Sequence, residues 1–212
     1  MRNRWLGLVL VGVALVISSW TWSTLPAEVR LPWQSASRSM VKREVAALFL
    51  PGVMLSVWLV LGVFPRIDPR RANYARFADT YWLLGNAVLL TLLAAHGMLV
   101  SGIEPIDRLI VAAAGVLVTL LGNYLGRVEP NWFFGIRTPW TLESDVVWRR
   151  THRTMGRVLF VAGLLLVAFA PMVTLPAAPV LGALAAMTAA LAMVVSWIYW
   201  RSESGSGSGS GG

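Results

Sequence analysis

The sequence predicts an all-α membrane protein, built as a bundle of six transmembrane helices. Hydrophobic residues occupy 57% of the 212 positions and charged residues only 13%, whereas a soluble domain carries about 25% charged residues. The mean hydropathy is +0.66. Six stretches approach the roughly 20 apolar residues that a helix needs to cross a bilayer core. They are residues 5–22, 45–64, 81–101, 109–126, 154–170 and 178–200.

The first apolar stretch resembles a secretory signal peptide only in part. Arg2 and Arg4 precede it, as basic residues precede the apolar run of a signal peptide. The run is long, however, and it ends in SSWTWS without a clear small-x-small cleavage site. Trp20 and Trp22 are better explained as anchors at the membrane–water interface. We therefore expect residues 5–22 to be the first transmembrane helix.

The last two stretches carry features that bear on packing. Pro171 follows the fifth stretch, so that helix either stops near Ala170 or kinks at the proline and continues. In the sixth stretch small residues recur every four positions, at Gly182, Ala186 and Ala190. Small residues on one face let helix backbones approach closely. We therefore expect this face to pack against another helix of the bundle.

The distribution of positive charge predicts the orientation of the helices. With the N-terminus inside, most of the 18 lysines and arginines fall on the inner side, in agreement with the positive-inside rule. The outer segment 23–44 is basic and goes against this trend, whereas the outer loop 102–107 holds only the acidic charges Glu104 and Asp107. We expect both termini to lie on the inner side of a bacterial cytoplasmic membrane.

Three regions are expected along the chain. Residues 1–80 form an N-terminal region of two helices with an outer loop, and residues 81–201 form a four-helix region. The four-helix region carries an unusual segment, residues 122–157, with the sequence GNYLGRVEPNWFFGIRTPWTLESDVVWRRTHRTMGR. Residues 202–212 are rich in serine and glycine, which is typical of a flexible linker added to a natural chain.

The middle of segment 122–157 is predicted to be an ordered loop on the inner face rather than one helix. Pro130 and Pro139 disfavour helical conformation in the residues before them, and Gly135 is a natural turn residue. The aromatic run 132–134 is too apolar for a free loop. We expect it either to dip into the inner membrane interface or to pack against the ends of the spans.

An amphipathic helix is expected to follow this loop and to lead into the fifth span. Thr141 is its expected N-cap, and Glu143 and Asp145 fall in the first turn, where the helix dipole favours acidic residues. Trp148 and His152 lie on one face of this helix, and four arginines share the other face. The arginines are Arg149, Arg150, Arg153 and Arg157. The arginine face suits a helix that lies on anionic lipid.

The sequence lacks the common signatures of enzymes. It contains no cysteine, no H-E-x-x-H, no G-x-S-x-G and no P-loop. Its aspartates fall in loops or at their edges, so no pair of aspartates is expected at membrane depth. His96 and His152 are expected on opposite sides of the membrane and therefore do not share a metal ion. We expect no catalytic residue, no metal site and no cofactor.

Few polar residues lie within the spans. Asn86 and His96 fall in the third span, and Asn123 closes the fourth. An ionisable group at membrane depth is costly, and it therefore suggests an intramembrane functional site. A neutral histidine that donates a hydrogen bond to a neighbouring helix explains His96 equally well, and the sequence leaves both interpretations open.

The net charge of +8 has a simple explanation in this topology. A basic protein is a candidate for nucleic-acid binding. Here most of the excess charge lies at the inner membrane face, where anionic lipid headgroups attract it. We therefore expect anionic membrane lipids as partners, and no direct contact with nucleic acid.

Segment 122–157 closely resembles the signature of the SdpI family of bacterial membrane proteins. In that family the pattern runs roughly G-N-Y, then P-N-x-x-x-G-I-R-T-P-W-T, then V-W-x-x-T-H-R-x-x-G. The matching residues are Asn123, Pro130, Asn131, Gly135, Ile136, Arg137, Thr138, Pro139, Trp140, Thr141, Trp148, Thr151, His152, Arg153 and Gly156. The stretch FPRIDPRRANYARF is similar to the first inner loop of the family. Residues LPAEVRLPW resemble a small domain of unknown function often found ahead of the signature, but Trp33 stands where that pattern often has a histidine.

The resemblance implies a protein that gives immunity to a secreted peptide toxin. It further implies that the protein senses the toxin on its outer face and holds a soluble transcriptional repressor at its inner face. The residues implied to form the inner binding surface are Asn123, Pro130, Asn131, Gly135, Arg137, Thr138, Pro139, Trp140, Thr141, Trp148, His152 and Arg153. The alternative is a small transporter or lipid-handling protein, with a site between the third, fourth and fifth helices near Asn86, Asn123 and Arg137.

Overall fold

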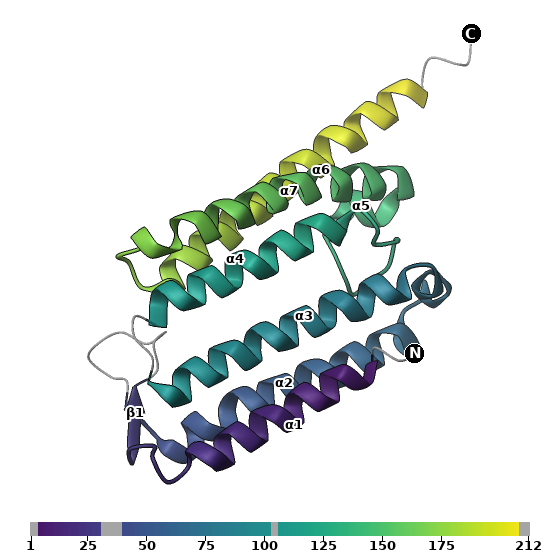
Figure 1. Ribbon diagram of the computed structural model, residues 1–212. Coiled ribbons are helices and arrows are strands. Elements are labelled where there is room, and N and C mark those ends of the chain that lie inside the picture. The colour runs from purple at the N-terminus through teal and green to yellow at the C-terminus, as the bar shows by residue number, and fades with distance from the viewer. Residues whose placement is uncertain (1–3, 31–39, 103–105, 208–212) are drawn as a thin grey trace.

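The computed structural model describes residues 4–30, 40–102 and 106–207 (Figure 1). Within them, six helices are long and apolar enough to cross a membrane, which confirms the predicted all-α membrane bundle. The six helices are α1 (Arg4–Thr21), α2 (Arg43–Ile67), α3 (Tyr74–Ser101), α4 (Ile106–Leu125), α6 (Asp145–Phe169) and α7 (Ala177–Gly207). The shorter elements are the strands β1 (Glu28–Arg30) and β2 (Met40–Lys42), the helix α5 (Pro139–Glu143), and the 3₁₀ turns η1 (Arg71–Asn73) and η2 (Ala170–Met172).

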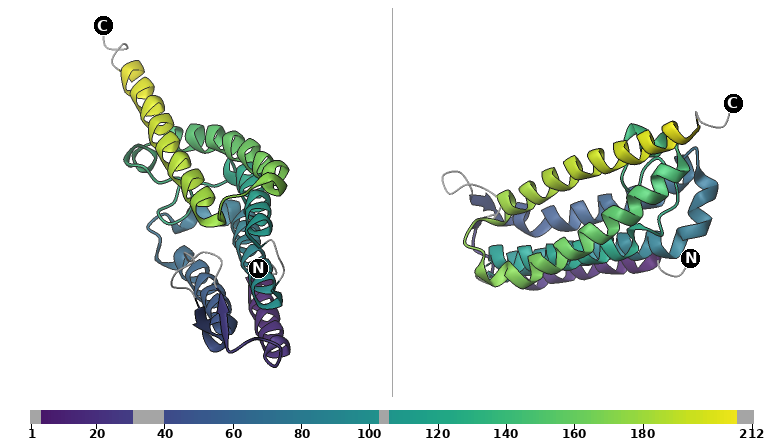
Figure 2. Two further views of the ribbon diagram at one scale, coloured as in Figure 1. Left: turned by 90° about the vertical axis from the view of Figure 1, so that its left-hand side faces the viewer. Right: turned by 90° about the horizontal axis from the view of Figure 1, so that it is seen from above.

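The long helices form two groups of three. Helices α1, α2 and α3 pack against one another, and α4, α6 and α7 form the second group. The two groups meet where α3 packs on α4 (Figure 1). The left view of Figure 2 shows that α7 extends past the other helices at its C-terminal end.

Both ends of the described chain lie at one end of the bundle. The first turn of α1, the last turn of α7, the short helix α5 and the loop before it gather there, and the β1 strand lies at the opposite end (Figure 1). This arrangement agrees with an even number of crossings. We call the end that holds α5 the loop end. That the loop end faces the cytoplasm stays a prediction from the positive charges.

The end opposite the loop end contains a small antiparallel sheet that the sequence did not reveal. Strand β1 pairs with β2, and Val29 lies opposite Val41. Leu25 and Val29 are buried together with Leu50 and Leu99 of the adjoining helices. This sheet therefore fixes the start and end of segment 23–44 against the bundle. Trp33, for which the sequence departs from the family pattern, lies outside the described residues.

Several helix boundaries differ from the predicted spans. Helix α6 ends at Phe169, and Pro171 lies in the 3₁₀ turn η2, so the helix stops rather than continuing through a kink. Asp107 was expected in an outer loop, but it lies in the first turn of α4. Its carboxylate accepts a 2.7 Å hydrogen bond from the Ala177 amide at the start of α7. Helix α7 continues through Gly207, so the first half of the expected linker 202–212 is helical.

The tightest helix packing occurs between α4 and α6, not on the small-residue face of α7. Gly122 and Gly156 face each other, and a Cβ added to either would lie 2.7–2.8 Å from the carbonyl oxygen of the other. Gly115 and Gly163 are equally confined one heptad further along. By contrast, a Cβ at Gly182 would meet nothing within 4 Å. The predicted interface at Gly182, Ala186 and Ala190 is therefore wrong for the described part of this chain, because these residues are exposed.

Candidate functional site

The segment between α4 and α6 forms a single ordered structure at the loop end of the bundle. The chain leaves α4 after Leu125, runs without regular structure to Thr138, and then makes the five-residue helix α5. We call residues 126–144 the signature loop. Three groups of hydrogen bonds fix it in place, centred on Asn131, on His152 and on Thr138.

Asn131 is the centre of the first half of the signature loop. Its side chain is fully buried. Its Oδ1 accepts hydrogen bonds from the amides of Phe133 and Phe134, at 3.0 and 2.6 Å. Its Nδ2 donates to the carbonyls of Glu129 and Phe134, both at 2.9 Å. One carboxamide therefore satisfies four backbone groups of a turn that has no helix or strand to satisfy them.

A buried aspartate from the loop between α2 and α3 joins the signature loop to the first group of helices. Asp68 is 2% exposed. Its carboxylate accepts bonds from the amides of Arg70 and Trp132, at 2.7 and 2.9 Å. The Tyr74 hydroxyl lies 3.0 Å from Asp68 Oδ2 and 3.3 Å from Asn131 Oδ1. A buried carboxylate is tolerated when donors surround it, and here three donors do.

His152 holds the second half of the signature loop. Its Nδ1 lies 2.9 Å from the Trp148 carbonyl, and the Ile136 amide donates to its Nε2 at 3.0 Å. Because a carbonyl can only accept, Nδ1 must carry the proton and Nε2 must be the acceptor. The ring is fully buried and stacks on the Trp148 indole, with centroids 4.1 Å apart. Both ring nitrogens are therefore engaged in holding the loop.

Gly135 is required by this arrangement. Its φ is +106°, a conformation that residues with a Cβ rarely adopt. A Cβ there would also lie 2.6 Å from His152 Nε2. The glycine therefore lets the backbone turn directly over the imidazole ring.

Helix caps differ from the prediction that one helix runs from Thr141 into the fifth span. Thr138 is the N-cap of α5, and its side chain and that of Thr141 form a reciprocal capping box. A second cap follows at Ser144, which accepts hydrogen bonds from the amides of Val146 and Val147 and begins α6. The segment therefore contains two helices with a break at Ser144. The sequence reasoning chose the wrong threonine, because both threonines suit a cap.

Two hydrogen bonds join the signature loop to α7, one from Thr138 and one from Ser144. Thr138 Oγ1 donates to Ser196 Oγ at 2.9 Å, and Ser144 Oγ donates to Glu203 at 2.7 Å. Glu203 lies in α7 and belongs to residues 202–212, the stretch expected to be a flexible linker. The signature loop is thus held by both groups of helices.

The phenylalanines of the aromatic run 132–134 pack on the helices of the first group. This packing is one of the two expected arrangements, the other being insertion into the membrane interface. The Phe133 ring stacks on Phe64 of α2 at 4.7 Å, and Phe134 meets Tyr81 of α3 edge to face at 5.2 Å. Trp132 remains 48% exposed. Arg137 donates to the Trp132 carbonyl at 3.0 Å and is otherwise exposed. These two side chains form the open surface of the loop.

The sequence-predicted binding residues divide into a buried set and a surface set. The buried set consists of Pro130, Asn131, Thr138, Thr141, Trp148 and His152. The surface set consists of Asn123, Gly135, Arg137, Pro139 and Arg153, with Trp140 half-buried. The structure brings all twelve to the loop end. The buried set holds the loop together, and a ligand from outside would meet the surface set.

Asn86 and His96 do not join this site or each other. They are ten residues apart on α3, a separation of about 15 Å along a helix, and both face α1. A Cβ at Gly7 of α1 would lie 3.1 Å from Asn86 Oδ1. His96 is fully buried, and its Nε2 lies 2.9 Å from the Ser18 hydroxyl of α1. This contact joins His96 to a neighbouring helix, and the tautomer decides whether the ring donates or accepts in it.

A large apolar groove opens beside the signature loop. It has a volume of about 630 Å³ and lies between α4, α6 and α7, with Arg137 and Thr138 among its lining residues. Leu184, Ala185 and Met193 line it from α7. Within the described residues, no three His, Cys, Asp or Glu side chains lie close enough to hold a metal ion.

Asp68 and Tyr74 were missed by the sequence reasoning. An aspartate in the arginine-rich loop IDPRR has the appearance of a solvated residue, because nothing in the local pattern indicates burial. One of its three donors, the Trp132 amide, comes from far along the chain. Only the similarity of FPRIDPRRANYARF to the family drew attention to this loop.

The chain is similar in sequence to known proteins. The family model of the SdpI/YfhL protein family matches residues 127–200. The Immunity protein SdpI of Bacillus subtilis (strain 168) is 26% identical over 169 residues, which cover 78% of this chain and 80% of that protein. No solved structure matches the chain.

Proposed function

Because this chain belongs to the SdpI family, we propose that it is a non-enzymatic protein of the bacterial cytoplasmic membrane that gives immunity to a secreted peptide toxin. The name of the Bacillus subtilis relative supports immunity as the activity. The six long apolar helices support a multi-pass membrane location.

One observation carries this proposal: the signature loop is a prebuilt surface rather than a catalytic constellation. His152, the one histidine of the loop end, is buried with both nitrogens bonded to the protein backbone. The buried polar side chains of the loop bond to the loop itself and to neighbouring helices. Such a rigid surface suits recognition, because binding then costs little conformational entropy.

We assign the two ends of the molecule to different partners. The β1–β2 sheet and its segment 23–44 would meet the toxin outside. The surface of Arg137 and Trp132, together with the exposed arginines at the start of α6, would dock a soluble repressor inside. Arg149 and Arg150 are exposed, so an acidic patch on the repressor would complement them.

Expression in a toxin-sensitive Bacillus subtilis strain that lacks its own SdpI tests the proposal. Cells carrying the natural sequence should survive the toxin against which that relative protects. Arg137→Ala and Trp140→Ala should lose protection while the protein still inserts. Arg76→Ala is the matched control, because Arg76 is an exposed arginine near the same end but outside the signature loop. Full protection by Arg137→Ala would remove the loop from the mechanism.

The groove between α4, α6 and α7 favours a second candidate function, lipid handling. Its walls are apolar and an arginine lies among its lining residues, which suits a molecule with a hydrocarbon chain and an anionic head. This function predicts flux or a bound lipid that is lost in Arg137→Ala, and no toxin resistance. A lipid-flux assay in vesicles made with the purified protein separates it from immunity.

A further inference from the structure

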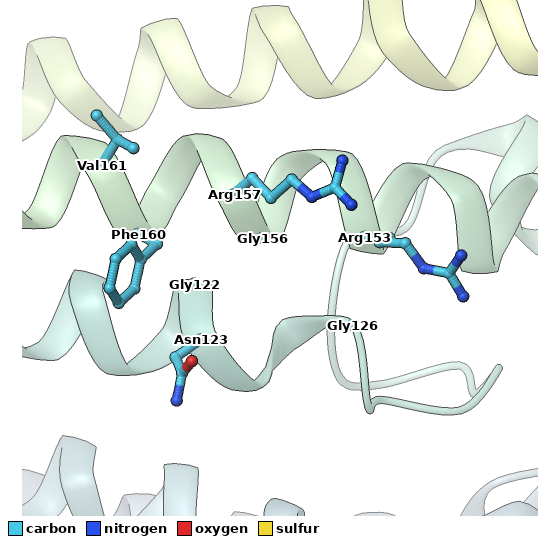
Figure 3. A pocket seen from close by; sticks show the side chains of 8 residues that line it. All are labelled: Gly122, Asn123, Gly126, Arg153, Gly156, Arg157, Phe160 and Val161. Carbon is cyan, nitrogen blue, oxygen red and sulfur yellow. The ribbon is translucent and has the colours of Figure 1, made fainter.

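A second groove lies between α4 and α6 on the loop-end half of the bundle, and its lining is polar as well as apolar. It has a volume of about 420 Å³. The lining residues are Gly122, Asn123, Gly126, Arg153, Gly156, Arg157, Phe160 and Val161 (Figure 3). Since three of the lining residues are glycines, much of the floor is bare backbone.

Two arginines and one amide carry the polar chemistry of this groove. Arg153 and Arg157 lie one turn apart on α6, and Figure 3 shows both side chains extended towards the start of that helix. Asn123 projects from α4. All three are exposed. Within the described part of the chain, none of these three side chains has a hydrogen-bond or ion-pair partner.

An anion would stabilise the two unpaired arginines. Two like charges one helical turn apart repel each other, and an anion between them removes this repulsion. Guanidinium groups bind phosphate in a bidentate way, and two of them on one wall can contact several oxygens of one phosphate group. Asn123 lines the groove from α4, and although Figure 3 shows its carboxamide pointing away from α6, a change of rotamer would bring a donor to the anion.

The groove changes character along α6. Phe160 and Val161, which are 38% and 55% exposed, line it on the side away from the arginine heads. Figure 3 shows the Arg157 head over α6 and the Arg153 head beyond the end of α4, next to the chain that follows Gly126. A phospholipid would therefore place its phosphate at the arginines and the start of its chains on Phe160.

We propose that Asn123, Arg153 and Arg157 form a binding site for the phosphate group of a phosphate ester in the groove between α4 and α6. The phosphate belongs either to the headgroup of an anionic phospholipid or to a soluble ester. This site differs from the generic attraction of basic residues to a membrane, because it assigns the affinity to two arginines and not to their neighbours. It does not depend on the immunity function.

Native mass spectrometry of the full chain in neutral detergent, with dioleoylphosphatidylglycerol as the probe, tests the site. The double variant Arg153→Gln/Arg157→Gln should bind the lipid at least about tenfold more weakly, since two charge-assisted contacts are lost. The matched control is Arg149→Gln/Arg150→Gln, which removes the same charge from the same helix outside the groove. The control should keep the wild-type affinity. Equal weakening in the two double variants would overturn the proposal.

Further arms identify the phosphate and guard against misfolding. Dioleoylglycerol, which lacks a phosphate, should not bind; binding equal to that of the phospholipid would also overturn the site. Displacement of the lipid by glycerol phosphate would assign a soluble ester, and persistence of the lipid would assign the headgroup; both support the phosphate site.

Asn123→Asp and Arg153→Lys/Arg157→Lys keep the helix surface polar. The first should weaken binding about tenfold by adding a negative charge, and the second should weaken it less than the glutamine pair does.

Discussion

The Ile136 amide donates a hydrogen bond to Nε2 of His152, and this single contact pins the turn of the signature loop to α6. The contact fixes the tautomer of His152, because Nδ1 already donates to the Trp148 carbonyl. The residues that resemble the family signature most closely are therefore largely the residues that make the loop rigid.

Replacement of His152 should loosen the loop without opening the bundle. His152→Phe keeps an aromatic ring on Trp148 but leaves the Ile136 amide without its acceptor, at a cost of about 1–3 kcal/mol. Thermal unfolding in detergent should shift to lower temperature, and trypsin should cut faster at Arg137. Arg149→Ala, an exposed arginine of the same helix, is the control and should change neither. A loop in His152→Phe as protected as in the wild type would contradict the role of the hydrogen bond.

Substitution of the facing glycines of α4 and α6 should be costly. A Cβ at Gly156 would lie 2.8 Å from the Gly122 carbonyl oxygen, so Gly156→Ala should force the helices apart and destabilise the protein by about 1–3 kcal/mol. Gly182→Ala is the control, because open space surrounds that position. The fraction that stays monodisperse after heating, measured by size-exclusion chromatography, should fall only for Gly156→Ala. Equal losses would show that the helices are not in backbone contact.

Asp68 and Asp145 should differ sharply in importance although both are near Arg70. Asp68→Asn loses acceptor capacity for three donors, one of them the buried Tyr74 hydroxyl, and should cost about 1–3 kcal/mol. Asp145 forms a partly exposed ion pair with Arg70, at 2.7 Å, and Asp145→Asn should cost less than about 1 kcal/mol. Melting temperatures of the two variants, measured side by side, check the ranking. A larger drop for Asp145→Asn would mean that the surface ion pair, and not the buried carboxylate, holds the two loops together.

The absence of cysteine from the sequence allows a clean test of orientation. Single cysteines at Glu28 and at Glu143, which are both exposed, lie at opposite ends of the bundle. With the loop end inside, a membrane-impermeant maleimide added to intact cells should label Glu28→Cys and not Glu143→Cys. Both should react after the cells are lysed. Labelling of only Glu143→Cys in intact cells would invert the orientation.

The helices were predictable from the sequence because membrane-spanning segments are recognised by their length and hydropathy. Which helices pack against each other was not predictable. Small residues occur on α4, α6 and α7 alike, and only the assembled structure shows that Gly122 and Gly156 are in contact while Gly182 is exposed. A periodic pattern of small residues indicates that another helix can pack closely against that face, but it does not indicate which helix does so.

The signature loop shows the same division. Proline and glycine positions predicted that residues 131–140 are not one helix, and the structure agrees. Thr138, rather than Thr141, caps α5, and its hydroxyl also bonds to the Ser196 hydroxyl of a distant helix. The Trp132 amide, one of the three donors to the buried Asp68 carboxylate, lies 64 positions further along the chain. Such long-range contacts leave no trace in a local pattern.

The glycine contacts between α4 and α6 also have a mechanical meaning. Side chains can change rotamer to absorb a displacement, but two backbones in direct contact have no such freedom. The two helices therefore behave as one stiff rod from the signature loop to the turn at Pro171. The start of α7 is hydrogen-bonded to Asp107 at the far end of that rod. We therefore expect a displacement at one end of α4 and α6 to tilt both helices together, rather than to be absorbed by side chains between them.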